Sequence, residues 1–319
     1  MSSSHLVIRA SEFDPKRIVF EDIKRRSSKG NTYYNARIMY NYPQPDGGVL
    51  IGPLNVSFPR IRAINGIRFQ DSDVDGSQKA CIMTMFDATR KDHLDVVGEN
   101  GFFNLLYKEV VRFLFEKRKD KVEGSNLNTL KSIPSAEAME AIVSNPLKTE
   151  EDEKTGERKL KPNFFQLFTK RFAPDGKGGL RPIRYGDPMW EGAKLYDSKP
   201  GDDGLPVPVE WSTLVQKGVD VDLDVHMQIS NVYIGSKASI QMSIKSAIIR
   251  GLYSSHAGCD RTHEIIETYK QNQTEADLVH AKLMSLTSRT EEIPVAAAVA
   301  SSPATATPGK TLDQVLSSE

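Results

Sequence analysis

The feature that most constrains this chain is a strict alternation of apolar and polar residues over residues 219–229, which read VDVDLDVHMQI. Successive side chains of a β-strand point to opposite faces, so the pattern predicts a strand with one buried apolar face. Residues 237–249 are again rich in β-forming side chains, and Gly235 and Ser236 stand between the two segments as a turn. The two segments therefore predict an antiparallel hairpin within a β-rich fold.

Further strands are predicted over residues 32–40, 49–58, 79–87 and 164–172. In the first of them, Tyr34, Ala36, Ile38 and Tyr40 share one face, and Tyr33, Asn35, Arg37 and Met39 share the other. Segment 79–87 is apolar on both faces, which predicts a central strand. Helices are predicted over 99–119, over 134–144 with Ser135 as the N-cap, and over 263–286. This order of elements predicts an α+β fold with a mainly antiparallel sheet or barrel.

The domain organisation follows from composition. We expect one β-rich domain over residues 1–290, with a helical insertion near 99–145, and a disordered tail over 291–319. Residues 294–310 (PVAAAVASSPATATPGK) carry almost no charge and few side chains that could form a core. Segment 311–319 places Leu312, Val315 and Leu316 at helical spacing. It is interpreted either as a frayed terminus or as a peptide that docks a replication partner.

The charge balance limits the kind of surface that the protein can offer. The chain has 42 Lys and Arg against 42 Asp and Glu. A uniformly basic protein is therefore excluded, and any surface for a polyanion must be a local patch. Two cysteines argue against a disulfide scaffold. There is neither an apolar run of about 18 residues nor a secretory signal within residues 1–10, so we expect an intracellular protein with no membrane partner.

Three segments concentrate basic and aromatic residues. Residues 24–37 hold five basic residues and no acid, and they run into a tyrosine-rich strand. Residues 58–69 add three arginines without an acid, and residues 158–185 hold eight basic residues against Asp175 alone. Aromatic rings can stack on unpaired bases while Lys and Arg follow the phosphates. The composition therefore favours single-stranded nucleic acid over the alternative that the aromatics form the core and the charges are merely solvated.

Other chemistry has weaker support. The sequence has no GxxxxGK[ST], GxSxG or HExxH motif. Asp220, Asp222 and Asp224 form a row on one strand face. We interpret this row as a solvent face that repels phosphate, and an Mg²⁺ site is the alternative. His256, Cys259 and His263 resemble a zinc spacing but supply only three ligands, and a turn leading into a helix is the favoured interpretation. No metal or other cofactor is expected.

The layout of segments carries a resemblance. An early strand pair (NTYYNARIMYNY, then GVLIGPLNVSFPRI) precedes a helical middle, a charged loop (TEEDEKTGERKLKPN) and the paired strands VDVDLDVHMQISNVYIGSKASIQMSIKSAII. This resembles the single-stranded-DNA-binding proteins of nucleocytoplasmic large DNA viruses, the African swine fever virus type. The resemblance implies an OB-like β-barrel that coats single-stranded DNA in viral replication and repair, without catalysis and with little sequence preference.

The leading hypothesis is thus a non-enzymatic single-strand-binding protein on an OB-like or Greek-key barrel with helical insertions. Phosphate contacts are expected from Lys24, Arg25, Arg26, Arg37, Arg60, Arg62, Lys170, Arg171, Arg181 and Arg184, and base stacking from Tyr33, Phe168 and Phe172. Tyr34 has the wrong parity for the face of Arg37 and is expected in the core. DNA is favoured, RNA stays open, and self-association along the strand is expected. The expected location is the host cytoplasm, a viral factory or the nucleus, with packaging in the virion left open. A virion structural protein, as a minor capsid or core component, is the alternative, and an enzyme using the three aspartates is a third hypothesis.

Overall fold

The computed structural model describes residues 6–28, 31–72, 75–87, 90–120, 128–151, 158–201, 203–215 and 219–254. The chain divides into two units, Met1–Thr287 and Ser288–Glu319, and every described residue belongs to the first. The helix expected over 263–286, the group of His256, Cys259 and His263, and the tail over 291–319 lie outside the described residues. Among the helices of the described part, none is long and apolar enough to cross a membrane.

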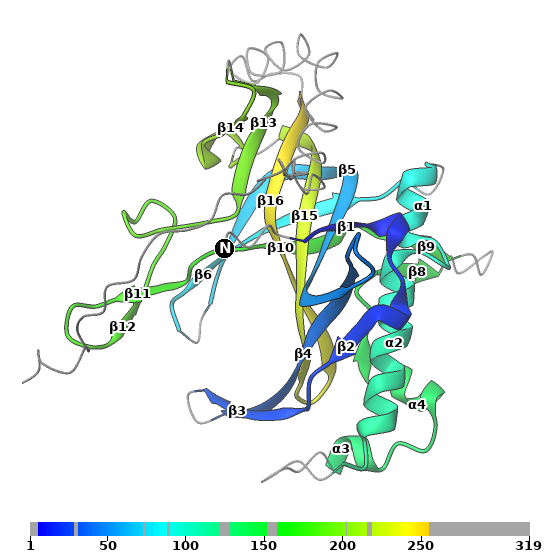
Figure 1. Ribbon diagram of the computed structural model, residues 1–319. Helices are drawn as coiled ribbons and strands as arrows, with labels where there is room; N and C mark the ends of the chain where they lie inside the picture. The colour runs from blue at the N-terminus through cyan, green and yellow to red at the C-terminus, as the bar shows by residue number, and fades with distance from the viewer. Residues whose placement is uncertain are drawn as a thin grey trace, which may run out of the picture. The chain divides into compact units, whose positions relative to one another are not determined.

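Twelve strands of the described residues form one sheet (Figure 1). Its principal strands are β4 (Asn31–Pro43), β5 (Val49–Asp71), β6 (Gln78–Met85), β10 (Asn163–Leu167), β15 (Val219–Ile234) and β16 (Ala238–Ser254). Its shorter strands are β1 (Ile8–Arg9), β2 (Ile18–Phe20), β3 (Lys24–Ser28), β7 (Val143–Ser144), β13 (Lys194–Pro200) and β14 (Pro206–Pro208). Two separate hairpins pair β8 (Thr149–Glu151) with β9 (Arg158–Leu160) and β11 (Phe172–Pro174) with β12 (Leu180–Pro182).

The main path through the sheet runs β14, β13, β16, β10, β6, β5, β15, β4 and β2, and β15 also pairs with β16. The long ladders β5–β6, β5–β15, β4–β15 and β15–β16 are antiparallel. The contact of β10 with β16 is parallel and joins Leu167 to Ile244. Together with the helices, this sheet confirms the predicted α+β class with mainly antiparallel strands.

The predicted faces of β4 and β15 are confirmed. Tyr34, Ala36, Ile38 and Tyr40 of β4 are buried, whereas Arg37 on the opposite face is exposed. In β15, the side chains of Val219, Val221, Leu223, Val225, Met227 and Ile229 are all buried. Full burial of each large apolar side chain stabilises the fold by about 1.5–3 kcal/mol, which is why the alternation fixes the orientation of both strands.

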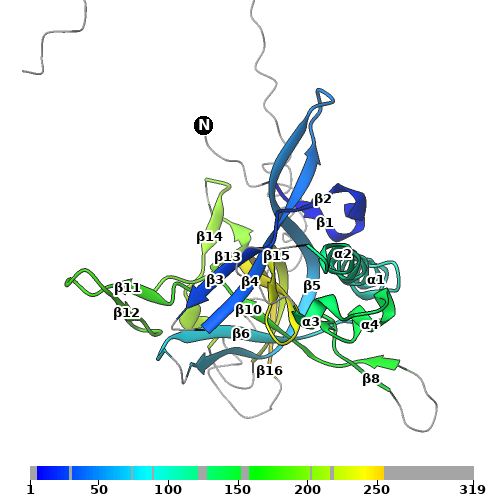
Figure 2. The same cartoon turned by 90° about the horizontal axis from the view of Figure 1, so that it is seen from below.

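The helices pack against the buried side of the sheet. They are α1 (Lys91–Val97), α2 (Phe102–Lys117), α3 (Asn128–Lys131) and α4 (Ala136–Glu140). In α2, Phe103 stacks on Phe165 of β10 with ring centroids 5.5 Å apart, and Phe113 stacks on Phe20 of β2 at 4.2 Å. Viewed from below, the helices gather on one side of β15 and β16, while β11 and β12 extend on the other (Figure 2). The outward face of β15 is therefore left mainly to polar and charged side chains.

Several boundaries differ from the predictions. The strand predicted over 49–58 continues to Asp71, and the helix predicted over 134–144 shortens to α4, although Ser135 does cap it by accepting the Ala138 N–H at 3.2 Å. The strand predicted over 164–172 is broken into β10 and β11. The break occurs because the Phe168 N–H donates to the Ile244 carbonyl, after which Lys170 N–H donates to the carbonyl of Glu191. The chain thus leaves β6 and joins a different neighbour.

Candidate nucleic-acid interface

The structure places the predicted contact residues in three separate regions. Lys24, Arg25, Arg26, Tyr33 and Arg37 lie on β3 and β4; Arg60 and Arg62 lie on β5; and Phe168, Lys170, Arg171, Phe172, Arg181 and Arg184 lie between the end of β10 and the segment after β12. Only the first region combines exposed cations with an accessible aromatic surface on one face.

A pair of tyrosines forms the centre of that region. Tyr33 of β4 and Tyr233 of β15 lie with ring centroids 5.2 Å apart and a 30° angle between ring planes. Tyr233 is 37% exposed. Arg26 pairs with Tyr33 across β3 and β4, and Asn35 pairs with both Lys24 and Tyr233. Directly paired residues of neighbouring strands share a face, so these side chains project together.

We call this surface the tyrosine face and define it by Lys24, Arg26, Tyr33, Arg37 and Tyr233. Its charge is positive. Glu21 lies 3.5 Å from the Lys24 ammonium and 3.6 Å from the Arg37 guanidinium. Exposed ion pairs of this kind contribute about 0–1 kcal/mol, so both cations can exchange Glu21 for a phosphate. Arg26 makes no ion pair with any described residue.

Arg25 and Tyr34 occupy the other face of the same two strands. Tyr34 is buried, which confirms its expected place in the core. Arg25 pairs with Tyr34 across the ladder but remains exposed at the sheet edge, where its guanidinium donates to the Thr32 hydroxyl at 3.5 Å. Arg25 therefore does not project with the tyrosine face.

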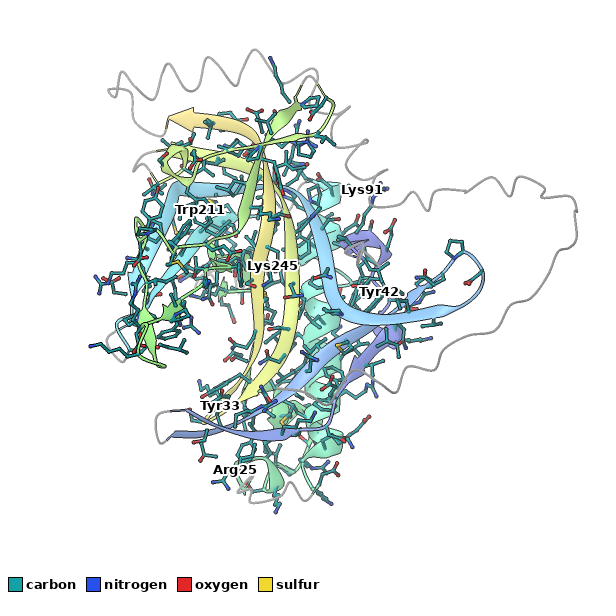
Figure 3. The ribbon with its side chains drawn as sticks, turned by 60° about the vertical axis from the view of Figure 1, so that its left-hand side comes forward. Arg25, Tyr33, Tyr42, Lys91, Trp211 and Lys245 are labelled. Carbon is teal, nitrogen blue, oxygen red and sulfur yellow. The ribbon has the colours of Figure 1, made fainter. Side chains whose placement is uncertain are left out.

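The tyrosine face continues along β15 and β16 as a polar strip. Gln228 and His226 of β15 pair with Ser243 and Ser246 of β16. On the same strand, Asn231 pairs with Arg37 of β4. Figure 3 shows Tyr33 at one end of these strands and Lys245 about midway along them. Lys245 lies six positions further along β16 than Ser239, the partner of Tyr233, which corresponds to roughly 20 Å at ~3.3 Å per residue.

The acidic row of β15 is not the open solvent face that the sequence predicts. Asp220 Oδ1 accepts the Asn65 N–H at 3.0 Å, and Asp222 forms an ion pair with Arg62 at 3.0 Å. Asp224 is buried beside the buried Arg250, with 2.7 Å between Oδ2 and Nε. The carboxylates therefore serve as internal hydrogen-bond acceptors and ion-pair partners. Among the described residues, no group of three or more His, Cys, Asp or Glu side chains has the arrangement of a metal site.

The acidic row also holds the irregular backbone of β5. Arg60 and Asn65 have φ of +34° and +58°, a region that non-glycine residues rarely adopt. Asp224 Oδ1 accepts the Arg60 N–H at 2.7 Å, and the Arg60 carbonyl lies 3.0 Å from Nε2 of buried His93. The Asp87 N–H donates to His93 Nδ1, so Nε2 carries the proton and donates to that carbonyl. These bonds support the two bulges, which bend the strand.

The Arg62 guanidinium is therefore already engaged by partners within the protein. Besides Asp222, its guanidinium lies 4.6 Å from the centre of the Tyr253 ring, and the Tyr253 hydroxyl donates to Asp222 at 3.1 Å. Hydrogen bonding to Asp222 raises the pKa of Arg62. A phosphate contact at Arg62 would have to compete with this network.

The residues predicted between 168 and 184 do not share one face. Phe168 lies under the Lys245 ammonium, which is 3.7 Å from the ring centre. Arg181 forms an ion pair with Asp187 at 2.6 Å, and Arg184 lies 3.7 Å from Asp71. Lys170, Arg171 and Phe172 are half-buried around the start of β11.

Two residues of the tyrosine face and its polar strip, Tyr233 and Lys245, were not predicted from the sequence. Tyr233 stands at an odd position, which the alternation of 219–229 would bury, but a register shift between Ile229 and Asn231 reverses the faces. The apolar Val232 and Ile234 on either side of Tyr233 are the sequence signal for that reversal. Phe164, on the separate surface described next, lies in the strand predicted over 164–172 but was not among the residues expected to stack on bases.

Phe164 marks a second outward surface, on β5, β6 and β10. Its ring is 49% exposed, and the Lys148 ammonium lies 5.2 Å from the ring centre. Met83 pairs with both Ile64 and Phe164 across the strands, which places the three side chains on one face. We call it the phenylalanine face and define it by Ile64, Met83, Lys148 and Phe164. Phe168, directly after the end of β10, carries the Lys245 ammonium over its ring and connects this face to Lys245.

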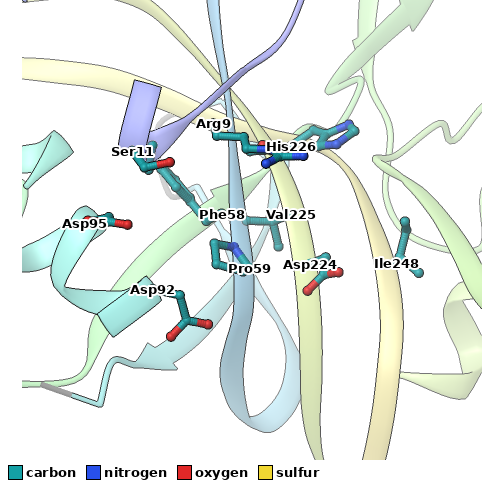
Figure 4. Close-up of a pocket in the computed structure, with 12 residues that line it drawn as sticks. Arg9, Ser11, Phe58, Pro59, Asp92, Asp95, Asp224, Val225, His226 and Ile248 are labelled. Atoms are coloured by element: carbon teal, nitrogen blue, oxygen red, sulfur yellow. The ribbon is translucent and has the colours of Figure 1, made fainter. Parts of the chain in front are cut away.

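A separate cavity of about 300 Å³ lies between α1, the first 3₁₀ turn and β15 (Figure 4). Asp92, Asp95 and Asp224 line it together with Arg9 and His226. Burial acts to raise the pKa of Asp92, but the hydrogen bond to Arg90 and the other nearby groups together outweigh burial, so the pKa is lowered. With three carboxylates around it, this cavity is a poor place for a phosphate.

No protein-family model matches the chain, and the comparisons with curated proteins and with solved structures found no match either.

Proposed function

We propose that the protein binds single-stranded nucleic acid through the tyrosine face, without catalysing a reaction. The observation that carries the proposal is the pair of contacting, accessible rings of Tyr33 and Tyr233 beside Lys24, Arg26 and Arg37. A ring with an accessible face can stack on any base, at about 1–3 kcal/mol per base, while the cations neutralise phosphates. A duplex hides its base faces, so this arrangement favours a single strand with little sequence preference.

The order of strand pairing supports an OB-like barrel as the framework. Five strands pair in the cyclic order β5, β6, β10, β16, β15 and back to β5, with the β10–β16 pair parallel and the others antiparallel. An OB-fold is a five-stranded, partly open barrel whose second and third strands bind oligonucleotides. In this assignment the second and third strands are β6 and β10, which carry the phenylalanine face. A bound strand would therefore have a second surface next to the polar strip.

The resemblance to the single-stranded-DNA-binding proteins of nucleocytoplasmic large DNA viruses leads to the same proposal. Under it, the protein coats single-stranded DNA during replication and repair in an infected cell, in the cytoplasm, a viral factory or the nucleus. Self-association along the strand and a partner for the tail remain predictions.

The enzymatic alternative has less support. Asp220, Asp222 and Asp224 would have to give up their bonds to Asn65, to Arg62 and to Arg250 before they could hold a magnesium ion. Breaking the buried ion pair between Asp224 and Arg250 alone costs several kcal/mol. We therefore assign the row to the support of β5.

One observation favours the second candidate, a virion structural component. The hairpin that joins β4 to β5 exposes three consecutive apolar side chains, Val49, Leu50 and Ile51, at 62%, 49% and 58%. Contiguous exposed apolar residues mark interaction sites more often than free surface. If this hairpin mediates assembly, the change of Leu50 and Ile51 to Ser will lower the oligomeric state in sedimentation velocity. If it does not, wild type and variant will sediment alike.

Charge substitution on matched surfaces tests the primary proposal. Arg26→Glu with Arg37→Glu reverses two charges of the tyrosine face, and Lys91→Glu with Lys108→Glu reverses two exposed charges on the helices. Fluorescence anisotropy with a labelled strand of about 30 nucleotides should show a large loss of affinity for the first variant and little change for the second. Equal losses would mean that binding is non-specific attraction to the whole molecule, and no loss in either would reject the tyrosine face.

A further inference from the structure

A second cavity lies on the outward side of β15 and β16, between β13 and the end of β10. Its volume is about 550 Å³, within the range of small-molecule sites. We call it the lysine cavity, because Lys194 and Lys245 are both in its lining. The rest of the lining that matters here is polar: Asn55, Gln228, His226 and Ser246, with Glu191 as the one carboxylate among the described lining residues.

Strand pairing brings these groups onto one surface. Lys194 of β13 pairs with Ser246 of β16, and Ser246 pairs with His226 of β15. The Ser246 hydroxyl lies 3.3 Å from His226 Nδ1. Three neighbouring strands therefore present a lysine, a hydroxyl and an imidazole in one row across the sheet.

Lys245 is the unusual member of this group. It stands at a register shift between His226 and Met227, so it is an extra residue in β16, and it is half-buried. Its ammonium rests on the Phe168 ring at 3.7 Å and forms no ion pair with a described residue, Glu191 included. Burial lowers the pKa of this ammonium. A partly desolvated cation without a counter-ion is stabilised when an anion arrives.

We propose that the lysine cavity binds the phosphate group of one nucleotide, with Lys245 and Lys194 as the charged contacts. The inference rests on the proposed single-strand binding and deepens it. The cavity lies roughly 20 Å along β16 from the tyrosine pair. It also lies beside Phe168, next to the phenylalanine face. A strand that passes from one face to the other crosses the cavity. The Gln228 amide and the Ser246 hydroxyl can donate to phosphate oxygens. The Asn55 amide donates one N–H to the Leu6 carbonyl at 3.1 Å and has its second N–H for a phosphate oxygen.

Small ligands isolate the cavity from the rest of the surface. Thymidine 5′-monophosphate, inorganic phosphate and thymidine are each titrated into the full-length, ¹⁵N-labelled chain, and amide shifts are followed by TROSY NMR. The two phosphate-bearing ligands should shift residues of the lysine cavity, and thymidine should not. Lys245→Met keeps an unbranched chain over Phe168 but removes the charge. In this variant the amide shifts caused by the two phosphate-bearing ligands should vanish, and in Lys245→Arg they should return. Lys108→Met, on α2, is the control.

The affinity for a single strand provides the second readout. Lys245→Met should weaken binding by about tenfold, in line with the loss of one hydrogen bond to a charged group, and should lower the salt slope by about 0.7. Equal shifts from thymidine and its phosphate would overturn the phosphate assignment. A strand that binds wild type and Lys245→Met alike would overturn the inference and leave the proposed function standing. Phosphate in the cavity with no strand binding would support the phosphate site and reject the proposed function.

Discussion

Removing the two rings of the tyrosine face is the perturbation that isolates stacking from charge. Tyr33→Ala and Tyr233→Ala each delete an aromatic surface and leave Lys24, Arg26 and Arg37 in place. Both rings lie outside the buried core. The loss of their mutual contact, about 0.5–1.5 kcal/mol for an aromatic pair, is small enough for the variants to stay folded.

The expected loss of binding follows from the stacking energy. At about 1–3 kcal/mol per stacked base, each single variant should bind a single strand roughly 5- to 150-fold more weakly. The rings lie 5.2 Å apart, too close to admit a base between them, so bases must stack on the outer faces of the pair. Because the residues touch, the double variant should lose less than the sum of the two single losses.

The assay is fluorescence anisotropy with a labelled strand, repeated across a salt series. The salt slope counts released phosphate counter-ions, so both alanine variants should keep the wild-type slope while their affinities fall. Tyr33→Phe and Tyr233→Phe retain the π-face and should bind like wild type. Thermal melts show that each variant is folded.

Two results would refute this reasoning. Wild-type affinity in the double alanine variant would show that no base stacks on the pair. A fall in the salt slope with the affinity would show that the tyrosines act by positioning the cations, and the stacking mechanism would then be wrong.

Three further outcomes follow from the same structure. Arg26→Gln with Arg37→Gln should lower the single-strand salt slope by about 1.4, at ~0.7 per lost phosphate contact, and an unchanged slope would remove both residues from the interface. Asp224→Ala removes the carboxylate that pairs with buried Arg250 and accepts the Arg60 N–H of β5. It should lower the free energy of unfolding by about 3–5 kcal/mol, measured by urea denaturation. A loss below about 1 kcal/mol would contradict the role of Asp224 in supporting β5. Burial raises the pKa of Tyr42 to about 12, above the unfolded value of about 10, so its contribution to stability is complete below about pH 10 and is lost towards pH 12. Tyr42→Phe should show a shallower decline over that interval, and the same decline as wild type would contradict the assignment.

The predictable part of the fold is the part governed by local alternation. The face of β4 that buries Ile38 and Tyr40, the buried row of β15, and the N-cap at Ser135 all depend on side chains a few residues apart. Hydrophobic burial and capping act at that range, so the sequence pattern carries them directly.

The unpredicted part depends on contacts between distant segments. The acidic row looks like a solvent face until β5 bulges against it, and its partners Arg60 and Asn65 lie more than 150 positions away. The break after Leu167 arises from pairing with Ile244 and from the Lys170 N–H bond to Glu191. The periodicity of the sequence predicts neither the contact between the acidic row and β5 nor the break after Leu167.

The candidate site shows the same division. Arg26, Arg37 and Tyr33 were predicted because they lie within one basic, aromatic segment. Tyr233 comes from the other end of the described chain, and it joins Tyr33 only through the β4–β15 ladder and a reversal of parity. The pair on which the proposed function depends is thus a product of tertiary structure.

The most direct test of the central claim compares a single strand with its duplex. The full-length chain is titrated against a labelled strand of about 30 nucleotides and against the matching duplex, each over a salt series. The proposed function predicts tight binding of the single strand that weakens linearly in log salt, with the duplex bound much more weakly at every salt concentration. Equal affinity for both forms, or no binding of the single strand at low salt, would contradict it.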